Sequence, residues 1–197
     1  MGLTAWITVA SAIALLSLSG CAHRRAPPPQ SGDGRGALPA AAPLGASEPA
    51  VLLDGIEIGQ RAPDFVLTSF DGRSISLADF RGKPVVIDFW AAWCPFCLGE
   101  FPVLERAYQT NRAGGLVVLG IHRSDGEDQA TGARFAAERG VTFPLLQDEG
   151  DRVYRQFSGG TPAMPLSYFI DRDGIIRAKI FGPKTDERIR EYLARIR

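Results

Sequence analysis

Two cysteines lie close enough together in the chain to act as a redox pair. Cys94 and Cys97 fall within residues 93–97 (WCPFC), and the 197-residue chain has only one other cysteine, Cys21. Three cysteines are too few for a disulfide-stapled scaffold, which indicates reactive rather than structural sulfur. We therefore expect Cys94 and Cys97 to alternate between a dithiol and a disulfide.

The residues around the pair predict how it is positioned. Residues 84–91 (PVVIDFWA) are typical of a buried central strand, and a helix is expected from residue 95 to residue 112. Cys94 would then begin the helix, where free N–H groups and the helix dipole favour a thiolate. Pro95 suits the first turn because it lacks an N–H, and the spacing puts Cys97 on the same helix face. Cys94 is thus predicted to be the more exposed nucleophile, and Cys97 the resolving thiol.

A cysteine pair at this spacing also occurs in zinc sites and in structural disulfides. A structural zinc site needs four ligands, and beyond the pair the chain offers only Cys21, His23 and His122. A structural disulfide here would close a very short loop and would constrain the unfolded chain little. We therefore expect no metal site and no cofactor, and His122 is assigned no role.

The rest of the chain after residue 50 predicts one α/β domain. Its expected elements are an opening hairpin (64–67 and 74–77), a strand (116–121), a helix (127–139), a terminal hairpin (166–170 and 175–181) and a last helix (186–196). Pro102 is expected to kink the helix that follows the cysteines. Strands and helices in this order predict a central mixed sheet flanked by helices on both faces.

The first 50 residues have the composition of an export signal and a tether. Residues 3–18 (LTAWITVASAIALLSL) form an uncharged apolar core that ends in Leu-Ser-Gly-Cys at residues 18–21. This ending resembles the bacterial lipobox, which implies a signal peptide over 1–20 and a lipid on Cys21 that anchors the chain to a membrane. Residues 21–50 are rich in Pro, Ala and Gly, so we interpret them as a flexible tether before a folded domain at 51–197.

Two other interpretations of the N-terminus stay open. No Lys or Arg precedes the apolar core, whereas Arg24 and Arg25 follow it, and this distribution could leave an uncleaved anchor with the domain in the cytosol. Cys21 could also be an incidental cysteine after an ordinary signal. Lipidation would instead place the domain at the bacterial cell envelope, facing the periplasm or another extracytoplasmic space.

The overall charge argues against one large class of partners. The chain has 22 basic and 22 acidic residues, and no stretch gathers Lys and Arg into a basic face. Neutralisation of phosphates requires such a face, so we expect no nucleic-acid partner.

Four separate motifs give the domain a family resemblance. Residues 87–97 (IDFWAAWCPFC) resemble the active-site segment of thioredoxins, and further motifs occur at 62–65 (APDF), 100–102 (EFP) and 169–174 (FIDRDG). Together they make residues 57–197 similar to the TlpA/ResA-like branch of exported thioredoxin-like proteins. The resemblance implies a thioredoxin-like fold with an N-terminal hairpin extension and thiol-disulfide exchange with protein substrates, apocytochrome c among the candidates. It also implies a reductase that draws electrons from a membrane electron-donor protein.

The resemblance assigns proton transfer to two acids. In thioredoxins an acid at the position of Asp88 lies beneath the cysteines, and a buried carboxyl without a partner has a raised pKa that suits this task. Glu100 matches an acid that lines the active-site cavity of ResA-like proteins. Asp88 could instead be satisfied by a nearby backbone donor, and Glu100 could be an ordinary helix-surface residue.

A proline near the end of the chain has the spacing of the cis-proline of this family. Pro165 is the favoured candidate, with Pro162 as a second one on a long approach loop. Because proline lacks an N–H, the backbone beside it can pair with an extended substrate peptide. The expected substrate-binding residues are Trp93, Pro95, Phe96, Met164 and Pro165.

Two rival activities are left open by the sequence. A thiol peroxidase of the peroxiredoxin type shares the opening hairpin, but Pro and Thr frame its reactive cysteine, whereas residues 89–93 contain neither. A copper-binding assembly protein of the same fold would space its cysteines one residue wider and would add a distal histidine. Peroxide consumption and copper titration distinguish these activities from disulfide exchange.

Overall fold

The structure, a computed structural model, describes residues 55–197. The predicted signal peptide, the lipidation site at Cys21 and the tether therefore lie outside the described residues. Inside this part of the chain, none of the helices has both the length and the apolar character that a membrane span requires.

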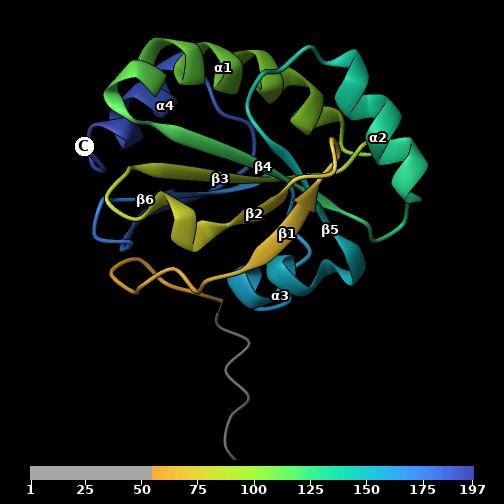
Figure 1. The fold of residues 1–197 in the computed structure, drawn as a ribbon, viewed down its shortest axis with the longest axis horizontal. Helices are drawn as coiled ribbons and strands as arrows, with labels where there is room; N and C mark the ends of the chain where they lie inside the picture. Colours follow the sequence, from red (N-terminus) through yellow and green to blue (C-terminus); the bar gives the residue numbers. More distant parts are fainter. Residues whose placement is uncertain (1–54) are drawn as a thin grey trace, which may run out of the picture. The chain divides into compact units, whose positions relative to one another are not determined.

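A seven-stranded sheet runs through the described residues (Figure 1). In chain order its strands are β1 (Val66–Ser69), β2 (Ser74–Ser76), β3 (Val85–Trp90), β4 (Val117–Arg123), β5 (Leu145–Asp148), β6 (Leu166–Ile170) and β7 (Ile176–Phe181). Across the sheet they follow the order β2-β1-β5-β4-β3-β6-β7. β3, β4 and β5 are parallel, and the other neighbours are antiparallel. The mixed sheet predicted from the sequence, with its opening hairpin, is confirmed.

Helices cover both faces of this sheet. They are α1 (Pro95–Asn111), α2 (Gln129–Glu138), α3 (Arg152–Ser158) and α4 (Asp186–Leu193), with short 3-10 turns η1 (Leu77–Phe80), η2 (Arg112–Gly114) and η3 (Glu149–Asp151). Figure 1 shows α1 and α4 on one side of the sheet and α3 on the other. This is the layered arrangement that buries a largely parallel sheet centre on both faces.

Alternation along β3 explains how the central strand is buried from two sides. Val86 and Trp90 enter the core that packs against α1, α2 and α4, whereas Ile87 and Phe89 enter the core on the α3 side. All of β3 is buried, including Asp88. Because side chains alternate along a strand, Asp88 shares the face of Val86 and Trp90, on which α1 and the cysteines lie.

Two boundaries differ from the sequence prediction in ways that affect the site, and two elements were not predicted. β4 runs on through His122 and Arg123, beyond the predicted end at residue 121. α2 begins after its N-cap Asp128, so Glu127 lies outside the helix that was expected to include it. The sequence does not predict β5 or α3, since such short elements carry too little periodicity to identify.

Candidate active site

Cys94 and Cys97 form a disulfide at the start of α1, with their Cα atoms 5.4 Å apart. Cys94 is the N-cap residue, and its Sγ accepts a hydrogen bond from the Cys97 N–H at 3.2 Å. Pro95 occupies the first turn of the helix. Once the disulfide is reduced, this same N–H and the helix dipole would stabilise a thiolate on Cys94.

The two cysteines differ little in exposure, and each is next to an exposed aromatic residue in the chain. Cys94 is 2% exposed and Cys97 is 0% exposed, so the predicted greater exposure of Cys94 holds only by a narrow margin. The flanking Trp93 and Phe96 are 49% and 61% exposed. A nearly buried disulfide therefore lies behind an apolar rim, and the N-cap position rather than exposure distinguishes the two sulfurs.

Asp88 of β3 and Glu100 of α1 meet at one lysine, Lys184, which lies between β7 and α4. The Nζ of Lys184 donates to Asp88 Oδ1 at 3.2 Å and also to Glu100 Oε2. Ser167 of β6, opposite Asp88 in the strand register, donates its hydroxyl to the same Oδ1. The lysine and both acids have side chains that are at most 1% exposed. Sequence reasoning found both acids and missed Lys184.

The charges of this cluster balance only if one carboxyl group holds a proton. Burial, and then the neighbouring charge of Asp88, raise the pKa of Glu100 from 4.5 to about 8, while Lys184 acts in the opposite direction. Glu100 is therefore protonated at neutral pH, which leaves one carboxylate facing one ammonium group. Asp88 Oδ2 and Glu100 Oε1 have no hydrogen-bond partner among the described residues, so these oxygens are available for proton exchange.

The cluster changes the interpretation of both acids. The Oδ1 of Asp88 accepts from the side chains of Ser167 and Lys184 rather than from a backbone donor, so Asp88 is not the wholly unpartnered acid that the thioredoxin comparison suggests. Glu100 is 1% exposed, which contradicts the alternative of an ordinary helix-surface residue. The raised pKa of the cluster belongs to Glu100, which therefore carries a proton near neutral pH.

Pro165 immediately precedes β6, and the peptide bond that joins it to Met164 is cis. This agrees with the spacing argument that favours Pro165 over Pro162. Leu166 pairs with Phe89, so Pro165 lies beside the end of β3, from which the chain continues to the cysteines. Met164 is partly buried and packs against the core that contains both cysteines.

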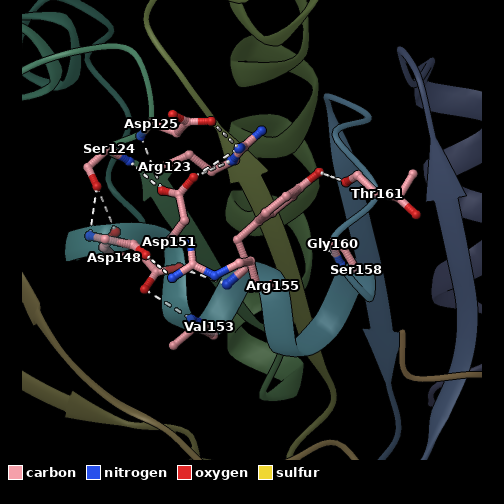
Figure 2. Close-up of polar contacts among 12 residues, drawn as sticks. Arg123, Ser124, Asp125, Asp148, Asp151, Val153, Arg155, Ser158, Gly160 and Thr161 are labelled. Carbon is pink, nitrogen blue, oxygen red and sulfur yellow. Dashed lines mark hydrogen bonds and ion pairs between the residues drawn. The ribbon is translucent and has the colours of Figure 1, made fainter. Parts of the chain in front are cut away.

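Tyr154 of α3 fixes the loop that leads to Pro165. Its hydroxyl lies 2.5 Å from the carbonyl oxygen of Thr161, which is labelled in Figure 2. The same hydroxyl lies 2.7 Å from the carbonyl oxygen of Ala163. The guanidinium of Arg123 stacks over the Tyr154 ring at 3.9 Å, and its Nε donates to Asp151 Oδ2 at 3.0 Å. The end of β4 therefore braces the loop that carries the cis-proline.

His122, to which the sequence analysis assigns no role, is paired with Glu127. Its Nε2 hydrogen-bonds to Glu127 Oε1, and the two side chains are 2% and 6% exposed. The same carboxylate accepts the backbone N–H groups of Ala92 at 2.9 Å and Trp93 at 3.2 Å. The spacing of His122 and Glu127 gives no signal in the sequence, because only the path of the loop brings them together.

After strand β3 the chain forms a Cys-x-x-Cys disulfide at the N-terminus of α1, and a cis-proline lies beside the end of β3. This arrangement defines a thioredoxin-like thiol-disulfide oxidoreductase. Comparison of the sequence with known families identifies the family of the chain. The AhpC/TSA family profile matches residues 58–179, and the chain belongs to that family.

Known relatives agree with this class. The thiol-disulfide oxidoreductase ResA of Geobacillus thermodenitrificans is 34% identical over 142 residues, which cover 72% of this chain and 79% of that protein. Among solved structures, a protein designated thiol:disulfide interchange protein DsbE from Chlorobium tepidum is 26% identical with a TM-score of 0.64, covering 71% of this chain and 96% of that one. The exposed lipoprotein thioredoxin Etrx1 of Streptococcus pneumoniae is 27% identical with a TM-score of 0.59, covering 67% and 98%. The chain is therefore a ResA-like thiol-disulfide oxidoreductase.

Proposed function

We propose that the protein is a lipid-anchored reductase of protein disulfides at the bacterial cell envelope, with Cys94 as the nucleophile and Cys97 as the resolving thiol. One observation carries the assignment of roles. The Sγ of Cys94 caps α1 and receives the Cys97 N–H, so a negative charge on Cys94 is the one that the helix stabilises. Cys97 lies in the buried core on the face of Asp88 and one helical turn before Glu100.

The reductive cycle follows from these roles. The Cys94 thiolate attacks one sulfur of a substrate disulfide, whose S–S bond breaks, and the first substrate sulfur leaves and takes up a proton. Cys97 then loses its proton and attacks Cys94 in the mixed disulfide, which releases the second substrate thiol and forms the Cys94–Cys97 disulfide. Two electrons have passed to the substrate. A dithiol electron-donor protein restores the pair by the same exchange run in reverse.

The buried acids handle the proton of Cys97. Deprotonation of a buried thiol needs an acceptor that does not depend on bulk water. Asp88 supplies the carboxylate, and Lys184 keeps the cluster neutral while Glu100 holds a proton of its own. We assign proton transfer to Asp88, with Glu100 as a second carrier that is able to release its proton at mildly alkaline pH.

The exposed rim is the surface for protein substrates. Trp93 and Phe96 present apolar area beside the disulfide, with Pro95 between the cysteines. We assign the other side of the binding surface to Met164 and Pro165, where backbone groups next to the proline can pair with an extended peptide. An unfolded or extended disulfide-bearing protein, apocytochrome c being one candidate, fits such a surface.

Membrane attachment supports reduction over oxidation. The Leu-Ser-Gly-Cys ending at residues 18–21 and the tether at 21–50 would hold the domain near a membrane electron donor, and similarity to an exposed lipoprotein thioredoxin is consistent with that placement. Outside the cytosol no soluble thiol pool supplies electrons, so a reductase needs such a donor. Mass spectrometry of the mature protein should find an acylated Cys21 as the N-terminal residue. An intact Met1 or an unmodified Cys21 would refute the anchor.

The direction of electron flow is tested in growing cells. Cells are quenched with acid and alkylated, and the redox state of the Cys94–Cys97 pair is read from the mass shift. A reductase should be found mainly as the dithiol while its membrane donor is intact, and a pair that stays oxidised under that condition would make the protein an oxidase. In parallel, Cys97→Ala should accumulate mixed disulfides with substrate proteins, and the matched Cys94→Ala variant should accumulate none.

A further inference from the structure

A buried carboxylate holds the backbone directly in front of the cysteine pair. The two oxygens of Glu127 accept separate N–H groups, Oε1 from Ala92 at 2.9 Å and Oε2 from Trp93 at 3.2 Å. Trp93 is the residue before Cys94, so these contacts determine how the chain enters the N-cap of α1. A carboxylate that accepts backbone N–H groups forms strong, charge-assisted hydrogen bonds.

His122 is built into the sheet as the support for this carboxylate. It lies opposite Trp90 in the register of β3 and β4, with the two ring centroids 4.7 Å apart, and the Phe70 ring lies at 5.6 Å. Gly132 of α2 closes the remaining side, because a Cβ at this position would come within 2.5 Å of the imidazole. With its ring confined in this way, His122 can present Nε2 in one direction only, toward Glu127.

A second contact anchors the same segment. The indole Nε1 of Trp93 donates to the carbonyl oxygen of Asp125 at 3.1 Å. Asp151 Oδ1 in turn accepts the N–H groups of Ser124 at 2.8 Å and Asp125 at 3.2 Å, as part of the network around Arg123 in Figure 2. The loop that carries Glu127 is therefore itself fixed, so its carboxylate is a firm point of attachment rather than a mobile side chain.

We propose that Glu127, oriented by His122, is a positioning residue for the redox reaction: it fixes the Ala92–Trp93 segment and places a negative charge in front of Cys94. The fixed segment keeps Cys94 at the N-cap. The charge opposes formation of the Cys94 thiolate, which makes the pair more reducing than the helix N-terminus alone would make it. This inference rests on the proposed role of Cys94 as the nucleophile.

The test separates position from charge with two variants and a matched control. Glu127→Ala removes both backbone contacts. Glu127→Gln removes the charge and keeps the size of the side chain; its amide oxygen can keep the contact with Ala92, while its NH2 group cannot accept the Trp93 N–H. Asp128→Asn removes one charge from the neighbouring residue, which is exposed and caps α2 through Thr131, a task that Asn performs equally well. Each change is made in the full chain, with and without Cys97→Ala.

Hydrogen exchange measures the positional effect without any substrate. In Glu127→Ala the amides of Ala92 and Trp93 should exchange about tenfold faster or more, while the amide of Ile87 in the middle of β3 keeps its rate, since the opening is local. Asp128→Asn should change none of these rates. Unchanged exchange at Ala92 and Trp93 in Glu127→Ala would overturn the positional half of the proposal.

The rate of alkylation against pH measures the effect on Cys94. In the Cys97→Ala background, Glu127→Gln should lower the pKa of Cys94 by about half a unit, a roughly threefold gain in thiolate near neutral pH. Asp128→Asn should leave it unchanged. A Cys94 pKa that stays the same or rises in Glu127→Gln would overturn the electrostatic half. The amide exchange experiment tests the positional effect of Glu127 independently, even if the trapping experiment showed that Cys94 is not the nucleophile.

Discussion

The buried acid Glu100 makes a quantitative prediction about stability. Its pKa is about 8 in the folded protein against 4.5 as its ordinary value. Below pH 4.5 the carboxyl is protonated in both states, and it has no effect on the free energy of unfolding. Between pH 4.5 and 8 the unfolded chain releases a proton that the folded chain retains, so rising pH favours unfolding. A pKa difference of this size lowers the free energy of unfolding by about 5 kcal/mol, and the full loss is reached above pH 8.

Replacing Glu100 by Gln removes this ionisation while keeping the shape of the protonated acid. The variant and the wild type should differ little at pH 5, and the variant should become progressively more stable than the wild type toward pH 9. Urea unfolding of the oxidised proteins across this range measures the difference, with Glu187→Gln on the exposed surface of α4 as the control. Parallel stability curves for Glu100→Gln and the wild type would refute a protonated Glu100 at neutral pH.

Three further changes test other parts of the site. Lys184→Met leaves a buried carboxylate without its cation, so the free energy of unfolding at pH 7 should fall by about 3 to 5 kcal/mol in urea titrations. Tyr154→Phe should cost about 1 kcal/mol and should raise the KM for protein disulfides more than it lowers kcat, because the loop before Pro165 loses its anchor. Phe96→Ser should change stability by less than about 0.5 kcal/mol, yet should slow reduction of protein disulfides and not of a small disulfide. An equal loss with both substrates would contradict a docking role for Phe96.

The features that local sequence determines could be predicted. The apolar run of β3, the proline in the first turn of α1 and the cysteine spacing place the disulfide at a helix N-terminus, as the structure has it. The spacing between Pro165 and the turn after β6 likewise selects the proline with the cis bond. In each case the information lies within about ten residues, over which periodicity and turn chemistry are informative.

The features that depend on distant chain segments could not be predicted. Lys184 lies 96 residues from Asp88 and 84 from Glu100, and nothing around it in the sequence marks a buried lysine. Glu127 lies 34 residues from Trp93 and looks like the first turn of a helix until the true start of α2 is known. Lysine and glutamate are usually surface residues, so composition alone favours the wrong assignment for both.

Two groups of buried carboxylates lie near the cysteine pair, and we expect them to affect it in different ways. The inner one, Asp88 and Glu100 with Lys184, is close to neutral while Glu100 is protonated, so near neutral pH its electrostatic effect on the sulfurs is small. The outer one, Glu127 with His122, lies beside the entrance to α1, and its charge opposes the helix dipole at Cys94. The inner assembly gains its charge only as Glu100 ionises near pH 8. Below that pH we expect the outer assembly and the helix N-terminus to set the stability of the Cys94 thiolate, while the inner one supplies the proton acceptor that the resolving step requires.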